Sequence, residues 1–347
     1  MMKVKKLVII LALLVVMFVL VFCSEKFLDR YIVRILNLIA INVILALSMT
    51  LTNGFTGLFS LGAAGFMSIG AYTTALLTMS VEGKAMNFFM EPQVAFLASL
   101  HTPFIVALVI GGLLAAAIGF LVASPVLRLR GDYLAIATLG FGEIVCVVFV
   151  NLQKVTNGAL GLKGIPTIAN MYWTWGLAAF AVIFIAAFIS SSYGRALKSI
   201  REDEIAAQAM GINIFKSKIL AFTISAFFAG IGGGLTASLI ATIDPNMFRF
   251  TLTFQVLLMI VLGGMKSITG SIVGATLVTV LLELLRAVES SVDLGFVIIP
   301  GVPGMRMLVF SGILIIVVIF LREGIVGERE LSWRIFGIKE DNKYGSS

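Results

Sequence analysis

The side chains best suited to chemistry lie in one polar insertion, residues 193–218, between two apolar segments. Charged residues fill its first half: Arg195, Lys198, Arg201, Glu202, Asp203 and Glu204. Small residues follow, and the run ends at a glycine: Ala206, Ala207, Ala209 and Gly211. Acidic groups favour a helix N-terminus, and glycine readily closes a helix in the left-handed conformation. The pattern predicts a short helix with a narrow alanine face that a soluble partner protein can grip; an ordinary amphipathic loop helix is the alternative.

Glu143 is an acidic residue inside the apolar run 135–150. An ionised carboxylate at the centre of a bilayer costs about 2.5–3.5 kcal/mol on insertion scales, so it should face the bundle interior or a cavity and have a partner. Two roles are open for it. It contacts a translocation path, or it is a structural acid whose hydrogen bonds hold Thr138 and the neighbouring helices in place.

The sequence offers few groups for catalysis or metal binding. His101 is the single histidine, and Cys23 and Cys146 lie in apolar runs, which predicts neither a metal site nor a disulfide framework. A nucleotide-binding loop needs a glycine directly before its lysine, and Lys266 lacks one. We therefore expect no catalytic residues, no metal site and no cofactor bound by this chain. If ATP drives its activity, another subunit must hydrolyse it.

The composition identifies the elements that must position these residues. Hydrophobic residues make up 60% of the 347, charged residues 12%, and the mean hydropathy is +1.09. Soluble domains carry about 25% charged residues, so an ordinary soluble enzyme and a disordered regulator are excluded. The net charge of +7 is too thinly spread to form a phosphate-binding surface, and we expect no nucleic-acid partner. The partner that this composition requires is a lipid bilayer.

Ten apolar segments are candidate membrane spans, and crossing the hydrocarbon core takes about 20 residues. They are residues 7–23, 31–51, 57–79, 104–124, 133–151, 173–192, 218–240, 252–266, 270–288 and 305–321. The expected fold is an all-α, polytopic transmembrane bundle of about ten spans, forming a single domain over residues 1–347. Its glycine content suits close helix packing in lipid, as in the two Gly-x-x-x-Gly runs that begin at Gly230 and Gly270.

The distribution of basic residues predicts the orientation of the chain. With the N-terminus in the cytoplasm and alternating segments, sixteen of the 25 basic residues fall on the cytoplasmic side and nine on the other. This excess predicts that both termini, the insertion 193–218 and the tail 322–347 are cytoplasmic. We interpret residues 7–23 as a retained span, because Val21 and Phe22 are too bulky for signal-peptide cleavage before Cys23.

The third segment, residues 57–79, is unusually rich in glycine and serine. One interpretation is a broken or re-entrant helix, which membranes tolerate only where protein or a water-filled cavity provides hydrogen-bond partners for the backbone. The other is that its small residues simply allow close helix packing. The two interpretations are compatible. The candidate translocation-path residues come mainly from this region: Asn53, Thr56, Ser60, Gly62, Ser68, Thr138 and Glu143.

A family resemblance rests first on the polar insertion. Glu204-Ile-Ala-Ala207, followed by Gly211, resembles the cytoplasmic loop of permease subunits of ATP-binding-cassette importers, with one residue inserted after the glutamate. The longer run 200–207 is similar to the LivM-like branch of the branched-chain amino acid permeases. Further similarities extend from about residue 37 to 327, at residues 57–62, 70–72, 127–136, 138–144 and 261–264.

The resemblance implies an importer permease of the bacterial plasma (inner) membrane that passes branched-chain or similar neutral amino acids. It implies that the 194–216 loop couples this chain to ATPases through Arg195, Arg201, Glu202, Asp203, Glu204, Ala206, Ala207 and Gly211. It also implies four kinds of partner: a homologous, LivH-like second permease, two ATP-binding-cassette ATPase subunits, an extracytoplasmic substrate-binding protein and the bilayer.

Three places depart from the family pattern and leave the cargo open. Ala63 stands where histidine is usual after Ser-Leu-Gly, and Cys146 stands where arginine often follows Gly-Glu-Ile. The last span ends in Arg322-Glu323-Gly324, where Arg-Pro-Arg-Gly is common. The same importer type also carries urea, short amides, or sugars and nucleosides. A different class, an ion-coupled carrier or channel acting alone, is disfavoured because it would need several intramembrane charges, and this chain has Glu143 and little else.

Overall fold

The computed structural model describes residues 16–286 apart from 20, 23, 90 and 130, followed by 292–293, 298–299, 304, 308–312, 315, 319, 324–327 and 330. The predicted first segment (7–23), last segment (305–321) and tail (322–347) therefore lie largely outside the described residues, and both termini lie wholly outside them. The statements below concern the described residues.

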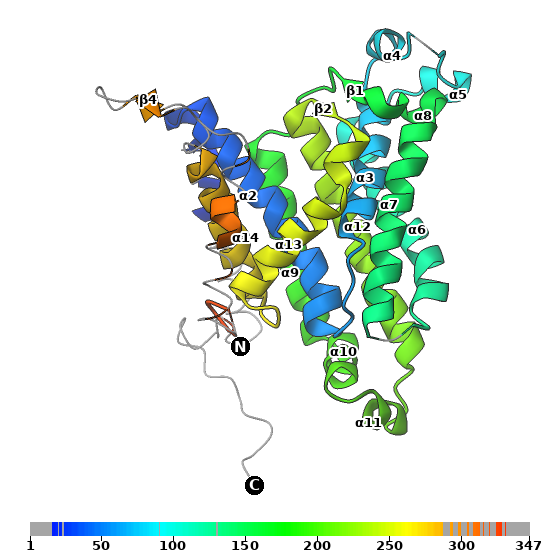
Figure 1. The fold of residues 1–347 in the computed structure, drawn as a ribbon, viewed down its shortest axis with the longest axis vertical. Helices are drawn as coiled ribbons and strands as arrows, with labels where there is room; N and C mark the ends of the chain where they lie inside the picture. Colours follow the sequence, from blue (N-terminus) through cyan, green and yellow to red (C-terminus); the bar gives the residue numbers. More distant parts are fainter. Residues whose placement is uncertain are drawn as a thin grey trace.

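The described chain is almost entirely helical, as predicted (Figure 1). The α-helices are α2 (Arg30–Met49), α3 (Ala63–Thr78), α4 (Val81–Asn87), α5 (Ala95–Ser99), α6 (Phe104–Val126), α7 (Asp132–Asn151), α8 (Gln153–Thr156), α9 (Met171–Ser190), α10 (Ser192–Glu202), α11 (Glu204–Ala209), α12 (Ile214–Ile240), α13 (Phe250–Gly263) and α14 (Ile268–Leu284). The π-helix η1 (Thr50–Phe55) continues α2, and the 3-10 turns are η2 (Gly158–Leu160) and η3 (Pro245–Phe248).

Strands are short and serve as connections between helices. β1 (Leu162–Lys163) pairs antiparallel with β2 (Thr242–Ile243), with Leu162 opposite Ile243. β3 (Val292–Asp293) pairs antiparallel with β4 (Ile298–Ile299). The β1–β2 pair ties the loop after α7 to the loop after α12.

Eight of the ten predicted segments fall within the described residues, apart from residues 287–288, and each contains one of the helices; in the third segment the helix α3 begins only at Ala63. Five helical stretches are long and apolar enough to cross a membrane: Arg30–Phe55, Phe104–Val126, Asp132–Asn151, Met171–Ser190 and Ile214–Ile240. α13 and α14 are shorter apolar helices. The structure thus confirms a polytopic helical bundle.

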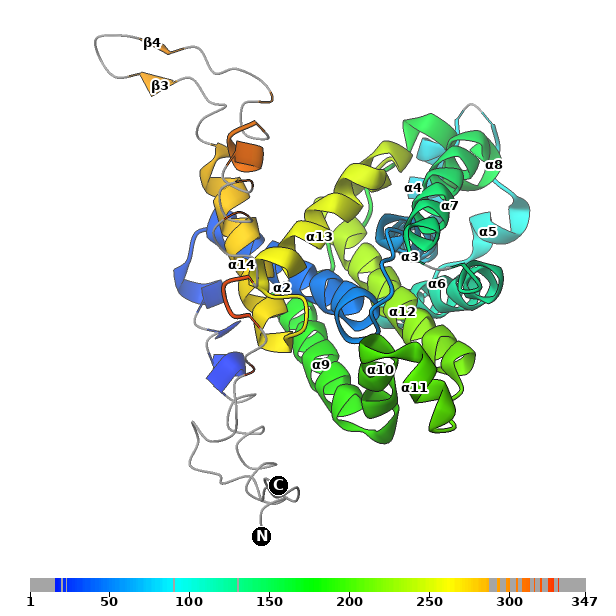
Figure 2. The same ribbon diagram turned by 60° about the horizontal axis from the view of Figure 1, so that its bottom comes forward.

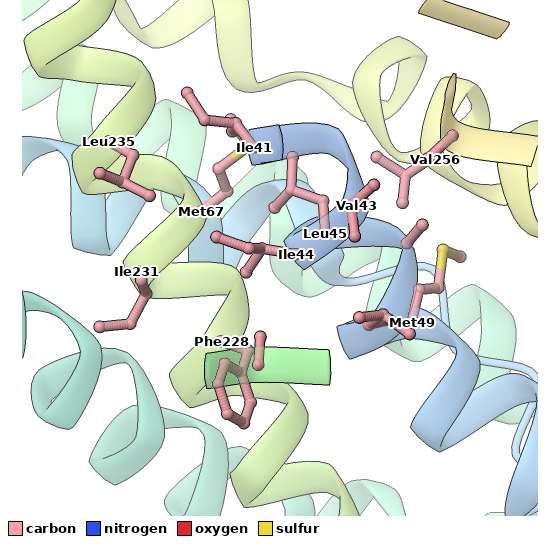
Figure 3. Packing of buried hydrophobic residues seen from close by; sticks show 14 of the residues in the cluster. Ile41, Val43, Ile44, Leu45, Met49, Met67, Phe228, Ile231, Leu235 and Val256 are labelled. Atoms are coloured by element: carbon pink, nitrogen blue, oxygen red, sulfur yellow. The ribbon is translucent and has the colours of Figure 1, made fainter. Parts of the chain in front are cut away.

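The core is built around α2 and α12. The second half of α2 is buried on all sides, and its Ile44 faces Phe228 and Ile231 of α12 (Figure 3). On the opposite side of α2, Val43 lies toward Val256 of α13 (Figure 3). α12 also packs extensively along α3 and α6, which places α2, α3, α6 and α12 together at the centre of the bundle.

Glycines bring three of these backbones into direct contact. A Cβ added to Gly70 of α3 would lie 2.1 Å from the carbonyl oxygen of Gly230 in α12, and one added to Gly230 would lie 2.7 Å from Cβ of Ala115 in α6. A Cβ on Gly263 of α13 would lie 1.9 Å from the carbonyl oxygen of Gly270 in α14. No other residue fits at these distances, so the glycines permit the close packing that the sequence predicted.

The two ends of the bundle differ. α4, α5 and α8 gather at one end, and α10 and α11 project from the other (Figure 1). Figure 2, in which the latter end comes forward, shows α2, α13 and α14 on one side and α6 and α7 on the other, with α3 and α12 between them. The functional candidates lie along this central division.

Candidate functional site

The backbone breaks between η1 and α3. Helical structure ends at Phe55, residues 57–62 form neither helix nor strand, and α3 begins at Ala63. Gly57 has a φ of +72°, in the left-handed region that glycine adopts without strain. The third predicted segment is therefore a broken helix, and close packing of its glycines accompanies the break.

Side chains from three elements satisfy the backbone of the break. Asn53 Nδ2 donates to the Ser60 carbonyl at 3.1 Å, and its Oδ1 accepts the Ser60 N–H at 3.2 Å. Thr138 of α7 accepts the Leu61 N–H at 2.9 Å, and Thr253 of α13 accepts the Ala64 N–H at 3.1 Å. Buried backbone groups must find such partners, so α7 and α13 hold the break in place from both sides.

The structure brings most of the predicted path residues together. Asn53, Thr56, Ser60 and Thr138 are all buried at the break, and a Cβ on Gly62 would lie 3.3 Å from the Thr138 carbonyl oxygen. Ser68 is further along α3, where its hydroxyl donates to the Gly65 carbonyl of its own helix at 2.8 Å. Thr253 belongs to the group but was missed, since a threonine within an apolar helix carries no distinguishing pattern. A role in translocation stays a prediction for all of them.

Glu143 lies apart from the break and links two helices. Its Oε1 accepts the N–H of Phe250, the first residue of α13, at 3.0 Å, and its Oε2 lies 3.3 Å from Nη2 of Arg249. A carboxylate at a helix N-terminus is favoured by the helix dipole. Glu143 therefore has the partner that the sequence requires, Arg249 together with the start of α13, and its role, in the path or in the structure, stays a prediction.

The polar insertion forms two helices, α10 and α11. The Asp203 carboxylate caps α11 by accepting the N–H groups of Ile205 and Ala206 at 2.8 and 3.0 Å. Gly211 follows with a φ of +83° and ends the segment, as its position predicted. Ile205 is 81% exposed and Met210 83% exposed, so the tip presents apolar side chains to its surroundings.

Arg201 faces the bundle rather than the exterior, and its side chain is 19% exposed. Its Nη1 donates to the Gly54 carbonyl at 3.2 Å, and a Cβ on Gly57 would lie 2.9 Å from Arg201 Cγ. Lys198 Nζ lies 5.5 Å from the centre of the Phe55 ring. α10 therefore rests directly on the break.

Ion pairs fix the remaining acids of the insertion. Arg201 also bonds to Glu202, and this hydrogen bond from the guanidinium lowers the pKa of the Glu202 carboxyl. Glu204 pairs with Lys218 at the start of α12. Of the predicted coupling residues, Arg201 and Ala207 pack inward, whereas Arg195, Glu202, Asp203, Ala206 and Gly211 are exposed.

Comparison with known families decides the class of the protein. The sequence profile described as "Branched-chain amino acid transport system / permease component" matches residues 31–318. The chain belongs to this family. The permease is 36% identical to the high-affinity branched-chain amino acid transport system permease protein LivM of Escherichia coli K12, over 79% of this chain and 68% of that protein.

Two further relatives show the breadth of the family. LivM of Salmonella typhimurium is 36% identical over 73% of the permease, which spans 63% of that protein. The guanosine ABC transporter permease protein NupQ of Bacillus subtilis is 29% identical over 54% of the permease and 60% of its own length. No solved structure matches the permease. The profile match includes the break, Glu143 and the whole α10–α11 insertion, so the described site lies inside the family region.

Proposed function

We propose that the chain is the transmembrane permease subunit of an ATP-driven importer that passes branched-chain or similar neutral amino acids across the bacterial plasma membrane. The observation that carries the proposal is the contact of Arg201 with Gly54, in the last turn of η1, and with Gly57, at the start of the break. An exposed helix pair that rests on the start of the non-helical residues 57–62 is suited to pass on a movement made outside the membrane. The LivM relatives supply the cargo class.

The proposed importer needs further subunits. ATP hydrolysis would take place on two ATP-binding-cassette subunits, which would contact the exposed surface of α10 and α11. Ile205 and Met210, both strongly exposed, are the apolar contacts expected to enter a groove on the ATPase. A homologous LivH-like permease would complete the translocation path, and an extracytoplasmic binding protein would deliver the amino acid.

The proposed orientation follows from charge. The excess of basic residues puts the α10–α11 end in the cytoplasm, together with both termini. The break then lies near the cytoplasmic end of the bundle, and the α4–α5 end faces outward.

Amino acids are favoured over nucleosides as cargo because the chain is more similar to the LivM permease than to the guanosine permease. The LivM match covers 79% of the chain at 36% identity, whereas the guanosine permease match covers 54% at 29%. Ala63 and Cys146, which depart from the family pattern, are both close to the site. Ala63 begins α3 at the break, and Cys146 Sγ donates to the Pro245 carbonyl at 3.3 Å.

Reconstitution tests the proposal. The chain would be purified with a LivH-like second permease and two ATP-binding-cassette subunits from the same organism and placed in proteoliposomes with the loaded binding protein. We expect uptake of labelled leucine only when ATP, both ATPases and the binding protein are present. Uptake by vesicles that contain this chain alone would overturn the proposal in favour of an independent carrier, and ATP-driven uptake of guanosine instead of leucine would overturn the cargo.

A further inference from the structure

Tyr72 presents a buried hydroxyl group that the packing does not use. The residue is 2% exposed, and its hydroxyl has no hydrogen-bond partner among the described residues. Its ring packs edge-on against Phe149 of α7, with centroids 4.8 Å apart, and lies 6.4 Å from the ring of Phe248 in η3. A phenylalanine would fill the same space without the cost of a desolvated, unpaired hydroxyl. The hydroxyl therefore calls for a ligand or a functional partner.

This hydroxyl lies near α7 and η3, and charged groups of both signs border these two elements. Glu143, Cys146 and Phe149 recur every three residues and so share one face of α7, the face that meets η3. Cys146 Sγ donates to the Pro245 carbonyl at 3.3 Å, and Glu143 pairs with Arg249, which directly follows η3, while Asp244 directly precedes it. We name Tyr72, Glu143, Cys146, Asp244 and Arg249 the α7–η3 cluster.

The α7–η3 cluster has capacity for a ligand. The Asp244 carboxylate accepts the Asn246 N–H at 2.9 Å, and a carboxylate offers about four acceptor positions. The side chains of Glu143 and Arg249 are 27% and 50% exposed, so both members of their pair can be reached from outside the packed core. An arginine offers five N–H donors, and Arg249 uses one of them on Glu143 at 3.3 Å.

We propose that the α7–η3 cluster is a transient binding site for a zwitterionic amino acid with an apolar side chain, an inference that rests on the proposed function. Arg249 would bind the carboxylate, Glu143 and Asp244 would bind the ammonium group, and the Tyr72 hydroxyl would donate to the ligand's carboxylate. The rings of Phe248 and Phe149 would lie beside the apolar side chain. Paired charges of opposite sign suit a ligand that is itself neutral overall.

The position of the α7–η3 cluster fits a stage of transport at which the amino acid has not yet passed the break. Glu143 lies five residues beyond Thr138 on α7, a rise of about 7.5 Å, and Tyr72 lies nine residues beyond Ala63 on α3, about 14 Å. Both displacements lead away from α10 and toward the α4–α5 end. An amino acid held in the cluster would therefore wait on the outer side of the break.

Substitution of Tyr72→Phe tests the site because it removes only the hydroxyl. The complete importer would be assayed in proteoliposomes with saturating leucine-loaded binding protein, and its melting temperature would be measured in detergent. We expect an equal or higher melting temperature, unchanged ATP hydrolysis in response to the loaded binding protein, and a leucine uptake rate lowered roughly tenfold, the effect of one lost hydrogen bond to a charged group. Tyr133→Phe, which removes an exposed hydroxyl from α7, is the matched control.

Two results would overturn the site. If Tyr72→Phe transports leucine like the wild type, the hydroxyl binds no cargo; if it melts at a lower temperature, the hydroxyl has a structural partner. Arg249→Gln gives a second measurement, and we expect it to lower leucine uptake per ATP hydrolysed. Both variants are compared with a wild-type importer that takes up leucine with ATP. If the wild-type importer takes up no leucine, the proposed function is overturned. If the variants transport leucine like the wild type, only the site is overturned.

Discussion

The guanidinium of Arg201 in α10 donates to the backbone carbonyl of Gly54, 147 residues earlier in the chain, at 3.2 Å. The contact joins the projecting helix pair to the last turn of η1, directly before the non-helical residues 57–62. A displacement of α10 thus reaches residues 54–57 through a direct hydrogen bond and through the packing of the Arg201 stem on Gly57.

Substitution of Arg201→Met should uncouple the importer. Methionine keeps an apolar stem against Gly57 but loses the donor to Gly54 and the ion pair with Glu202. We expect the ratio of leucine imported to ATP hydrolysed to fall several-fold in proteoliposomes, with the protein still folded. Arg128→Met, which removes an exposed basic residue at the same end of the bundle, is the control, and an equal loss in both variants would contradict the specific role of Arg201.

A Cβ at residue 54 should destabilise the permease. The added atom of Gly54→Ala would lie 1.8 Å from the carbonyl oxygen of Met265, in backbone that cannot move aside locally. Overpacking of this kind costs about 1–3 kcal/mol, so we expect a lower melting temperature and less folded protein in detergent. Gly176→Ala in α9 meets no atom within 4 Å and should melt at or slightly above the wild-type temperature.

Removal of the Thr138 hydroxyl should weaken the break. Thr138→Val has almost the same shape but leaves the buried Leu61 N–H without its acceptor, at a cost of about 1–3 kcal/mol. Thr138→Ser keeps the acceptor and should recover most of the loss. Melting temperatures of the two variants, with amide exchange at Leu61, measure the effect. Equal stability of valine and serine variants would show that the hydrogen bond does not hold the break.

Lys84 in α4 should give a pH-dependent contribution to stability. Its Nζ is buried and donates to the carbonyls of Leu97 and Leu100, and burial lowers the pKa of this ammonium group from 10.5. Between the lowered pKa and 10.5 the unfolded chain binds more protons than the folded one, so stability rises with pH in that window. Melting temperatures from neutral pH to 10.5 should show the rise, and Lys84→Met should abolish it. Lys154→Met, which removes an exposed lysine, is the control and should leave the rise in melting temperature intact. If the rise persists in Lys84→Met, another group causes it.

Much of the fold was predictable because each span is a local feature. A run of about 20 apolar residues identifies a helix by itself, and each of the eight predicted segments within the described residues contains a helix. The break was also foreseeable, since glycine and serine at residues 57–62 weaken the helix, and Asn53 and Ser60 are close enough in sequence to bond across it.

The partners across the bundle were not predictable, because helix rotation decides them. Glu143 clearly needed a partner, yet Arg249 lies 106 residues away, and nothing in the sequence connects the two. Thr253 could not be distinguished from other hydroxyls in apolar helices. Arg201 was predicted to serve coupling to an ATPase. Its inward direction follows from the burial of Gly194, Leu197 and Ile200 on the same helix, which only the packed structure reveals.

The glycine contacts between α3, α6 and α12 have a mechanical consequence. At Gly70 and Gly230 the backbones touch with no side-chain layer between them, so we expect α3, α6 and α12 to move together. The contact of Gly263 with Gly270 gives the same expectation for α13 and α14. If an ATPase displaces α10, as proposed, we expect the two groups of helices to shift relative to each other at residues 57–62, which Thr138 and Thr253 hold from both sides.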